Sequence, residues 1–393
     1  MIQDKKLQEI SDSIRDEIIT IRRTFHQYPE LSWKEFKTAE RIVRILQEEG
    51  LRVQSGICGT GVIAEIGEGG GRTIAVRADM DALPMYDAKD VPYASNVPGV
   101  MHACGHDSHM AIAIGVAKVL RKLNLNFLGR VRFIFQPSEE ATPSGAEELV
   151  KSGVMDNVDE IFAFHVDPEI PAGKIGLREG LLTAHCNEFN LSVLGKSGHA
   201  ARPHHSVDTI FLSTQVLNAL YEIVGNRTQA FAPAVLSIGK LSGGTKANVL
   251  PERVDISGSV RTIDEQTRNE ILKAIEERAS DITRAAGGSY QLEFLAPVPS
   301  VRNDSDLVRL IREIGETILS EDGIVSIKNV SMGGEDFAWY QTKAKGALIR
   351  LGARKPNDRV RYLHSQDFDI DESALPLGVS LMSTLLVQAL LKK

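Results

Sequence analysis

The densest group of chemically capable side chains in this 393-residue sequence is the run from Met101 to Met110, MHACGHDSHM. Thiolates and imidazoles are the ligands that borderline and soft divalent metals prefer. Cys104 and His106 are separated by one glycine, so both could reach the same ion. A solvated histidine-rich loop is the ordinary alternative. The run alone leaves both interpretations open.

Strand-like runs alternate with helical segments around this cluster. Residues 61–66, 73–78, 131–135 and 161–165 are apolar and β-prone, and a helix is expected over residues 110–123, with Asp107 or Ser108 as its N-cap. Alternation of this kind predicts an α/β layer, with a mixed, largely parallel sheet flanked by helices.

Acidic residues and a histidine follow or end three of these strands. Asp81 comes after the strand at 73–78, Glu139 and Glu140 come after the strand at 131–135, and His165 ends the strand at 161–165. Ligands of open α/β sheets bind outside the carboxyl ends of the strands. Each residue alone could be a turn or capping group, but together they are expected to converge on one crevice.

A second pattern begins near residue 188. Strands are expected at 189–194, 234–238, 253–260 and 290–294, with helices at 208–224 and 264–286. The order βαββαβ is that of a ferredoxin-like unit. Mixed helix and strand return after residue 300, with His364 in a loop before a closing helix. We therefore expect one domain made of residues 1–184 and 297–393 and an inserted domain at 185–296.

Composition narrows the class of protein. The chain exceeds the roughly 250 to 300 residues at which one core stops growing, which favours two domains. Its net charge is −7 and its Lys and Arg are dispersed, so neither nucleic acid nor a membrane is an expected partner. No uninterrupted apolar run approaches the length of a membrane span, and the N-terminus is polar. Three cysteines do not make a disulfide scaffold, which favours a cytoplasmic location.

Motifs spread over nearly the whole chain resemble those of the M20 metallopeptidase family, specifically the amidohydrolase branch that cleaves N-acyl amino acids. They are HQYPEL at 26–31, RADMDALP at 77–84, MHACGHDSH at 101–109, FQPSEE at 135–140, HV at 165–166, GHAARPH at 198–204, ANVLP at 247–251, GEDF at 334–337 and LHS at 363–365. So many motifs in register make the resemblance specific.

The resemblance implies a dinuclear metal site. Cys104 would bridge the two ions where other branches use an aspartate. His106 and His165 would bind one ion, and Glu140 and His364 the other. A shared thiolate and open positions for water suit two borderline ions about 3.5 to 4 Å apart. Cysteine favours zinc, with manganese, cobalt or nickel as alternatives.

The resemblance also implies roles outside the ligand set. Glu139 would be the general base, and Asp81 would orient a histidine ligand. By the same resemblance, residues 1–184 and 297–393 would form the dinuclear-metal catalytic domain and residues 185–296 a lid and dimerisation domain. His199 of the lid would reach the partner subunit's active site in a homodimer and hydrogen-bond the oxyanion. Asn248 and Arg261 would bind the α-carboxylate or nearby oxygens of the substrate.

The expected reaction is hydrolysis of the amide bond of an N-acetyl or aromatic N-acyl amino acid, which releases a carboxylate and a free amino acid. A dipeptidase or carboxypeptidase using the same site is the main alternative. Cys104 could instead be the nucleophile of a cysteine hydrolase, or the chain could be a noncatalytic binding protein. The metal dependence of activity separates the first two from the others.

Overall fold

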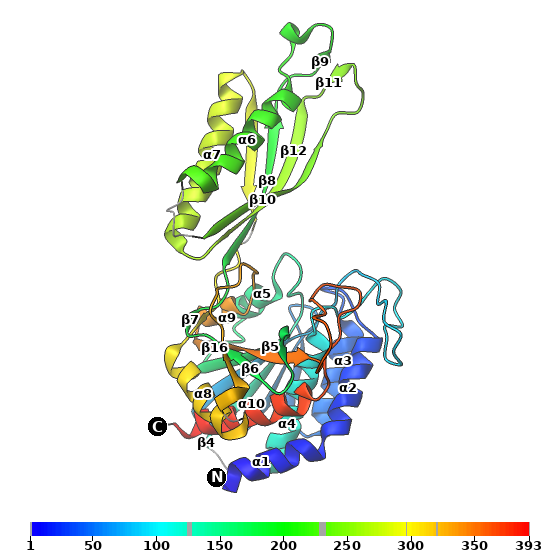
Figure 1. Ribbon diagram of the computed structural model, residues 1–393, viewed down its shortest axis with the longest axis vertical. Helices are drawn as coiled ribbons and strands as arrows, with labels where there is room; N and C mark the ends of the chain where they lie inside the picture. Colours follow the sequence, from blue (N-terminus) through cyan, green and yellow to red (C-terminus); the bar gives the residue numbers. More distant parts are fainter. Residues whose placement is uncertain (1, 124–127, 228–232, 296, 320, 393) are drawn as a thin grey trace. The chain divides into compact units, whose positions relative to one another are not determined.

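The structure is a computed structural model that describes residues 2–123, 128–227, 233–295, 297–319 and 321–392 (Figure 1). It divides into two compact units. The first comprises residues 1–180, 301–328 and 336–393, and the second comprises residues 181–300 and 329–335. Residue 296, at the predicted end of the lid, lies outside the described residues.

An eight-stranded sheet forms the centre of the first unit, in the order β1-β2-β4-β3-β5-β16-β6-β15. The pairs β3/β4, β3/β5, β5/β16 and β6/β15 are parallel, and the other three are antiparallel. The strands are β1 (Arg52–Ile57), β2 (Gly61–Ile66), β3 (Glu68–Asp79), β4 (Leu128–Gln136), β5 (Glu160–Pro171), β6 (Ile175–Leu177), β15 (Ile324–Ser326) and β16 (Lys345–Arg354). The predicted mixed, largely parallel sheet is confirmed.

Helices cover both faces of this sheet. They are α1 (Ile2–Ser13), α2 (Arg15–Gln27), α3 (Phe36–Glu48), α4 (His106–Leu123), α5 (Gly145–Lys151), α8 (Ser305–Leu319), α9 (Ala338–Gln341) and α10 (Ala374–Leu391), with short elements β7 (Gly180–Leu181), β14 (Arg302–Asn303) and η2 (Glu321–Gly323). The helices α4 and α10 pack against each other and against β3, whereas α5 and α9 pack against β4 and β16.

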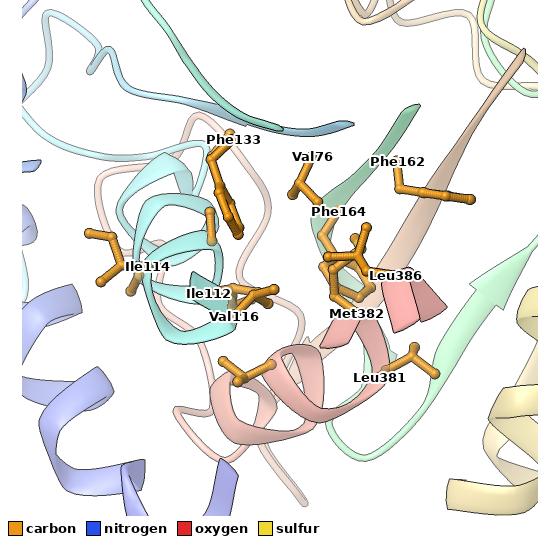
Figure 2. Close-up of a cluster of buried hydrophobic side chains, with 14 of the residues drawn as sticks. Val76, Ile112, Ile114, Val116, Phe133, Phe162, Phe164, Leu381, Met382 and Leu386 are labelled. Atoms are coloured by element: carbon orange, nitrogen blue, oxygen red, sulfur yellow. The ribbon is translucent and has the colours of Figure 1, made fainter. Parts of the chain in front are cut away.

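The main hydrophobic core lies between α4, α10 and alternate residues of the strands, because successive side chains of a strand point to opposite faces. Figure 2 shows this cluster, which includes Val76, Ile112, Ile114, Val116, Phe133, Phe162, Phe164, Leu381, Met382 and Leu386. By length and composition alone α10 could cross a membrane, a candidate that the sequence analysis did not single out, but 78% of it is buried in the protein. A core helix of a folded domain has the same properties.

The second unit is the expected βαββαβ arrangement. Its antiparallel sheet has the order β10-β12-β8-β13, and a two-stranded ribbon pairs β9 with β11. The elements are β8 (His185–Leu194), β9 (Gly198–His199), η1 (Pro203–His205), α6 (Thr209–Arg227), β10 (Ala234–Gly243), β11 (Val249–Leu250), β12 (Arg253–Thr262), α7 (Glu265–Ala285) and β13 (Ser289–Phe294). A separate core joins Phe189 and Leu191 of the sheet to Leu220 and Ile275 of the helices.

Candidate metal centre

The turn Cys104-Gly105-His106 leads directly into α4. The helix begins at His106, four residues before the expected Met110, so His106 and His109 both lie in its first turn and share a face. Gly105 has φ +85°, and a Cβ there would lie 2.2 Å from Cγ2 of Val166 in β5. Glycine is therefore required for the turn to pass β5 this closely.

Cys104 belongs to two groups of three donor atoms, each group lying within 4.8 Å. One group contains Cys104, His106 and His165, and the other contains Cys104, Glu140 and His364. The Cys104 Sγ atom is 3.6 Å from Nε2 of His165 and 3.4 Å from Nε2 of His364. His364 Nε2 is 3.0 Å from Oε1 of Glu140. The structure thus brings all five expected ligands together around one shared sulfur.

His165 does not end its strand, as the sequence suggested, because β5 continues to Pro171. Neighbouring β3 pairs with β5 only as far as Arg77 and Ala163, so the next part of β5 is open on that side. The Nδ1–H of His165 donates to the Val166 carbonyl at 2.8 Å, which leaves Nε2 with a free lone pair toward Cys104.

His364 reaches the site from a loop near the end of the chain. Its φ is +59°, an uncommon conformation for a residue other than glycine. Its backbone N–H donates to the Ala103 carbonyl at 2.8 Å, so the loop is tied directly to the segment that holds Cys104. Backbone hydrogen bonding therefore joins two ligands that lie 260 positions apart.

Asp81 holds two of the candidate ligands. Nδ1–H of His106 points at the Asp81 carbonyl (2.9 Å) and at Oδ1 (3.2 Å), which leaves Nε2 of His106 for a metal. The other oxygen, Oδ2, accepts from the Glu140 N–H at 3.0 Å and from the Ser32 hydroxyl at 2.7 Å. Burial opposes ionisation of Asp81, but its hydrogen bonds with His106, Ser32 and the Glu140 N–H hold its pKa below the usual value.

Glu139 lies at the edge of the same group. Its Oε2 is 3.9 Å from Nε2 of His106, and its side chain is only 12% exposed. The turn that carries it is held by Glu35, whose Oε1 accepts from the Ser138 N–H at 2.9 Å and whose Oε2 accepts from the Thr60 hydroxyl at 2.8 Å. Burial raises the pKa of Glu35. Sequence reasoning missed Glu35, because nothing near it in the chain distinguishes it from a surface carboxylate.

The site fits a divalent metal. Nε2 of His106 is fully buried and makes no hydrogen bond in the described parts of the chain. Leaving a buried polar nitrogen unpaired costs free energy, whereas a metal ion would use its lone pair. Burial also raises the pKa of the Cys104 thiol well above its usual range. A thiolate would therefore need a cation beside it, which disfavours Cys104 as an independent nucleophile.

A second buried polar group lies next to the site. Nδ1 of His26 is 2.7 Å from Oδ2 of Asp107, and Arg22 forms an ion pair with the same carboxylate; all three side chains are fully buried. The predicted N-cap role for Asp107 is wrong, since it lies inside the first turn of α4 and anchors that turn to α2. His26 therefore has a structural hydrogen-bonding role.

The three lid residues form two separate groups within the second unit. His199 pairs with Val249 in the ribbon, and the Ala200 N–H donates to the Asn248 carbonyl at 3.1 Å. Arg261 instead lies near the other end of β12, where Nη1 contacts Cys186 Sγ at 3.1 Å and the Met332 carbonyl at 3.0 Å. The ribbon joins β12 at its Arg253 end, and at a rise of about 3.3 Å per residue the strand from Arg253 to Arg261 spans about 26 Å.

Comparisons with known proteins agree with this architecture. The family model described as "Peptidase family M20/M25/M40" matches residues 75–388. The chain is 36% identical to the N-acetylcysteine deacetylase of Bacillus subtilis (94% of this chain, 96% of the relative) and 41% identical to the N-acyl-L-amino acid amidohydrolase of Geobacillus stearothermophilus (74% and 79%). It is also 36% identical to thermostable carboxypeptidase 1 of Saccharolobus solfataricus, with 95% of each chain covered.

A solved structure shows the same fold. The chain matches the YXEP protein of Bacillus subtilis, described as a dinuclear metal binding peptidase of the M20 family, with a TM-score of 0.81 and 34% identity over 96% of this chain and 99% of that one. The fold and its relatives thus define a hydrolase of the aminoacylase and deacetylase type. The chain belongs to the M20 peptidase family, in its amidohydrolase branch.

Proposed function

We propose that this protein hydrolyses N-acyl amino acids at a dinuclear metal centre, with Glu139 as the general base. The observation that carries the proposal is the pair of three-donor groups sharing Cys104, with Glu139 beside them. The relatives named as a deacetylase and an amidohydrolase support the substrate class. The proposed ligands are Cys104, His106, Glu140, His165 and His364.

Two divalent ions fit the donor set, zinc first, with manganese, cobalt or nickel as alternatives. When bound, they would polarise the acyl carbonyl and lower the pKa of a water toward neutrality. Glu139 accepts the proton of the attacking water and delivers it to the leaving amine. Asp81 keeps His106 and Glu140 in place throughout, through its contacts with both.

His199 is proposed to donate to the oxyanion. The Ala201 N–H donates to Nδ1 of His199 at 3.0 Å, so the proton of the neutral ring is on Nε2. The imidazole therefore presents an Nε2–H donor, as an oxyanion site needs. Arg261 is proposed to bind the α-carboxylate of the substrate, and Asn248 an oxygen near His199.

We propose a homodimer, which the positions of these groups support. His199 lies in the ribbon at the Arg253 end of β12, and the strand from Arg253 to Arg261 spans about 26 Å, which is too long for one small substrate to bridge within one lid. We therefore propose that Arg261 serves the site of its own chain and His199 that of a partner subunit. We also propose a cytoplasmic location, which the three free cysteines support.

Carboxypeptidase activity is the second candidate, because the chain is 36% identical over 379 residues to a relative named as a carboxypeptidase. Both reactions would use the same base and the same carboxylate-binding arginine. They differ in the group on the acyl side of the scissile amide. A panel of N-acetyl and N-benzoyl amino acids, set against dipeptides of the same amino acids, separates them by kcat/KM.

The proposed base is tested with Glu139→Gln. We expect kcat to fall by about 10² to 10⁴, because general base catalysis is lost while the side chain keeps its shape. Metal content, measured on the same preparation, should stay at two ions per chain. Glu148→Gln, which alters an exposed carboxylate paired with Lys151, is the control and should retain full activity. Near wild-type turnover by metal-loaded Glu139→Gln would disprove the mechanism.

A further inference from the structure

A fully buried chain of hydrogen bonds lies directly behind the candidate ligands. Nδ1 of His109 is 2.6 Å from Oδ1 of Asp79, and Nε2 of His109 is 3.0 Å from the Val166 N–H. The carbonyl of the same Val166 accepts from Nδ1 of His165 at 2.8 Å. Asp79, His109, Val166 and His165 are thus connected in one line that ends at a proposed ligand.

The tautomer of His109 follows from its partners. A backbone N–H is always a donor, so Nε2 of His109 must supply a lone pair to Val166. The ring proton is then on Nδ1, where the Asp79 carboxylate accepts it. His109 is held as the neutral Nδ1–H form, and only a side chain with a donor at one end and an acceptor at the other can make both bonds.

The His109 ring also contacts the rings of two proposed ligands. Its centroid is 5.5 Å from that of His106 and 5.0 Å from that of His165, the second contact being edge to face. The His109 side chain is buried at 3% exposure. His109 therefore packs against both ligand rings and also binds the backbone of the strand that carries His165.

Asp79 is fixed from its far side. Its Oδ2 accepts from Nη1 of Arg77, while Nη2 of Arg77 donates to Oδ1 of Asp336 at 2.7 Å. Gln136 donates to Oδ2 of the same Asp336 at 2.7 Å and accepts from Nε of Arg77 at 2.8 Å. The line thus begins at a fully buried carboxylate that is held on one side by Arg77 and on the other by His109.

We propose that His109, oriented by Asp79, is a positioning residue for the metal ion held by His106 and His165. The inference rests on the proposed metal function and adds to it a side chain that touches neither ion. The His109 ring packs against both ligand rings, and its hydrogen bond with the Val166 N–H fixes the backbone from which His165 projects.

The test compares three variants with the wild type by titrating cobalt(II) into metal-free protein. His109→Leu removes both hydrogen bonds, His109→Asn is too short to span both partners, and His109→Gln retains an acceptor and a donor at comparable reach. Cobalt(II) reports each site through its visible d–d bands and through a thiolate charge-transfer band from Cys104. The readout is therefore binding and ligand geometry, independent of turnover.

We expect His109→Leu and His109→Asn to weaken binding of one of the two ions by about 10-fold to 100-fold, the range seen when a group supporting a metal ligand is lost. The d–d bands of that ion should shift, and binding of the other ion should stay near wild type. His109→Gln should recover most of the affinity. If all three variants bind both ions as tightly as the wild type does, the inference is overturned.

His26→Leu is the matched control, because it also removes a fully buried imidazole whose Nδ1 contacts a buried aspartate, Asp107. Its ring contacts are with Tyr93 and His102, not with the proposed ligands. Arg22 still pairs with Asp107 in this variant, so the first turn of α4 stays anchored. The change should therefore lower thermal stability without weakening the binding of either ion. A similar loss of metal affinity in His26→Leu would show a general effect of core damage and overturn the inference. Wild-type protein that binds fewer than two ions would instead overturn the proposed function itself.

Discussion

Several buried carboxylates of the first unit each hold more than one partner. Asp81 fixes two proposed ligands, Glu35 fixes the turn that carries Glu139, and Asp87 gathers three partners near α2. The Asp87 side chain is 2% exposed; it contacts Nζ of Lys89 at 2.7 Å, the Ser95 N–H at 2.9 Å and Nε2 of His26 at 3.1 Å. Because their pKa values differ between the folded and unfolded chain, such carboxylates make the free energy of unfolding depend on pH.

Asp87→Asn tests this effect. Burial opposes ionisation of Asp87, but hydrogen bonds from His26, Lys89 and Ser95 hold its folded-state pKa below the usual 3.8. A depressed carboxyl pKa stabilises the fold above pH 3.8, and this stabilisation is lost as pH falls below 3.8 toward the folded-state value. The variant should therefore be less acid-sensitive than the wild type below pH 4. At pH 7 it should lose about 3 to 5 kcal/mol, because buried Lys89 loses its charge partner.

Urea unfolding of both proteins between pH 2.5 and pH 7 measures the difference. Asp281→Asn, which removes an exposed pair with Arg284, is the control and should change stability by about 0.5 kcal/mol or less. A wild type and an Asp87→Asn variant whose stabilities fall in parallel below pH 4 would contradict the assignment.

At the scale of elements, the turn before α4 determines whether two proposed ligands can meet. Gly105 gives this turn a positive φ and lets it pass within contact of Val166. We expect Gly105→Ala to lose about 1 to 2 kcal/mol from the backbone conformation, and more because its Cβ would lie 2.2 Å from Val166 Cγ2. Displacement of Cys104 from His106 should lower the metal content of the purified protein.

Gly99→Ala separates these two costs. Gly99 has φ +75°, but a Cβ there has no heavy atom within 4 Å. Its variant should therefore show only the backbone cost and should keep both metals. Thermal unfolding and metal analysis of the two variants make the comparison. Equal melting temperatures and equal metal contents would contradict a packing role for Gly105.

Local patterns predicted the regular elements well. The expected helices at 208–224 and 264–286 are observed as α6 and α7, and Asp264 caps α7 by accepting from the Thr267 N–H. The start of α4 was missed, because a run of buried His, Asp and Ser residues reads as a polar loop until its distant partners are known. The roles of Glu35, Asp79 and His109 could not be predicted for the same reason, since each depends on contacts with residues remote in the sequence.

At the scale of the whole molecule, the length of β12 makes a partner subunit part of the proposed mechanism. The proposal predicts that His199→Ala and Glu139→Ala proteins are each nearly inactive but recover activity when mixed. A mixed dimer contains one site with an intact Glu139 and an intact His199 from the other chain. If subunits exchange randomly, half of the dimers are mixed and each has one working site, so about a quarter of wild-type activity should return.

The two variants should be unfolded together, refolded and assayed against each protein refolded alone. Size-exclusion chromatography with light scattering verifies that dimers have formed, and differently tagged chains verify that they have mixed. Arg261→Ala mixed with Glu139→Ala is the control, because both residues are assigned to the same site. That pair should stay inactive after mixing. Recovery of its activity would mean that Arg261 also acts in trans. Absence of recovery in well-mixed His199 and Glu139 dimers would contradict the composite site.

The backbone hydrogen bond from His364 to Ala103 joins segments that are synthesised far apart in time. One proposed ligand pair, Cys104 and His106, is synthesised before the lid, whereas His364 comes after the whole lid, 260 positions after Cys104. A growing chain therefore carries a cysteine and two histidines throughout synthesis of the lid without the residue that completes the second donor group. On the proposed ligand set, binding of both metals has to wait until the lid has been synthesised. Deletion of the C-terminal segment from residue 360 onward would leave a thiol-containing half-site rather than a weaker enzyme.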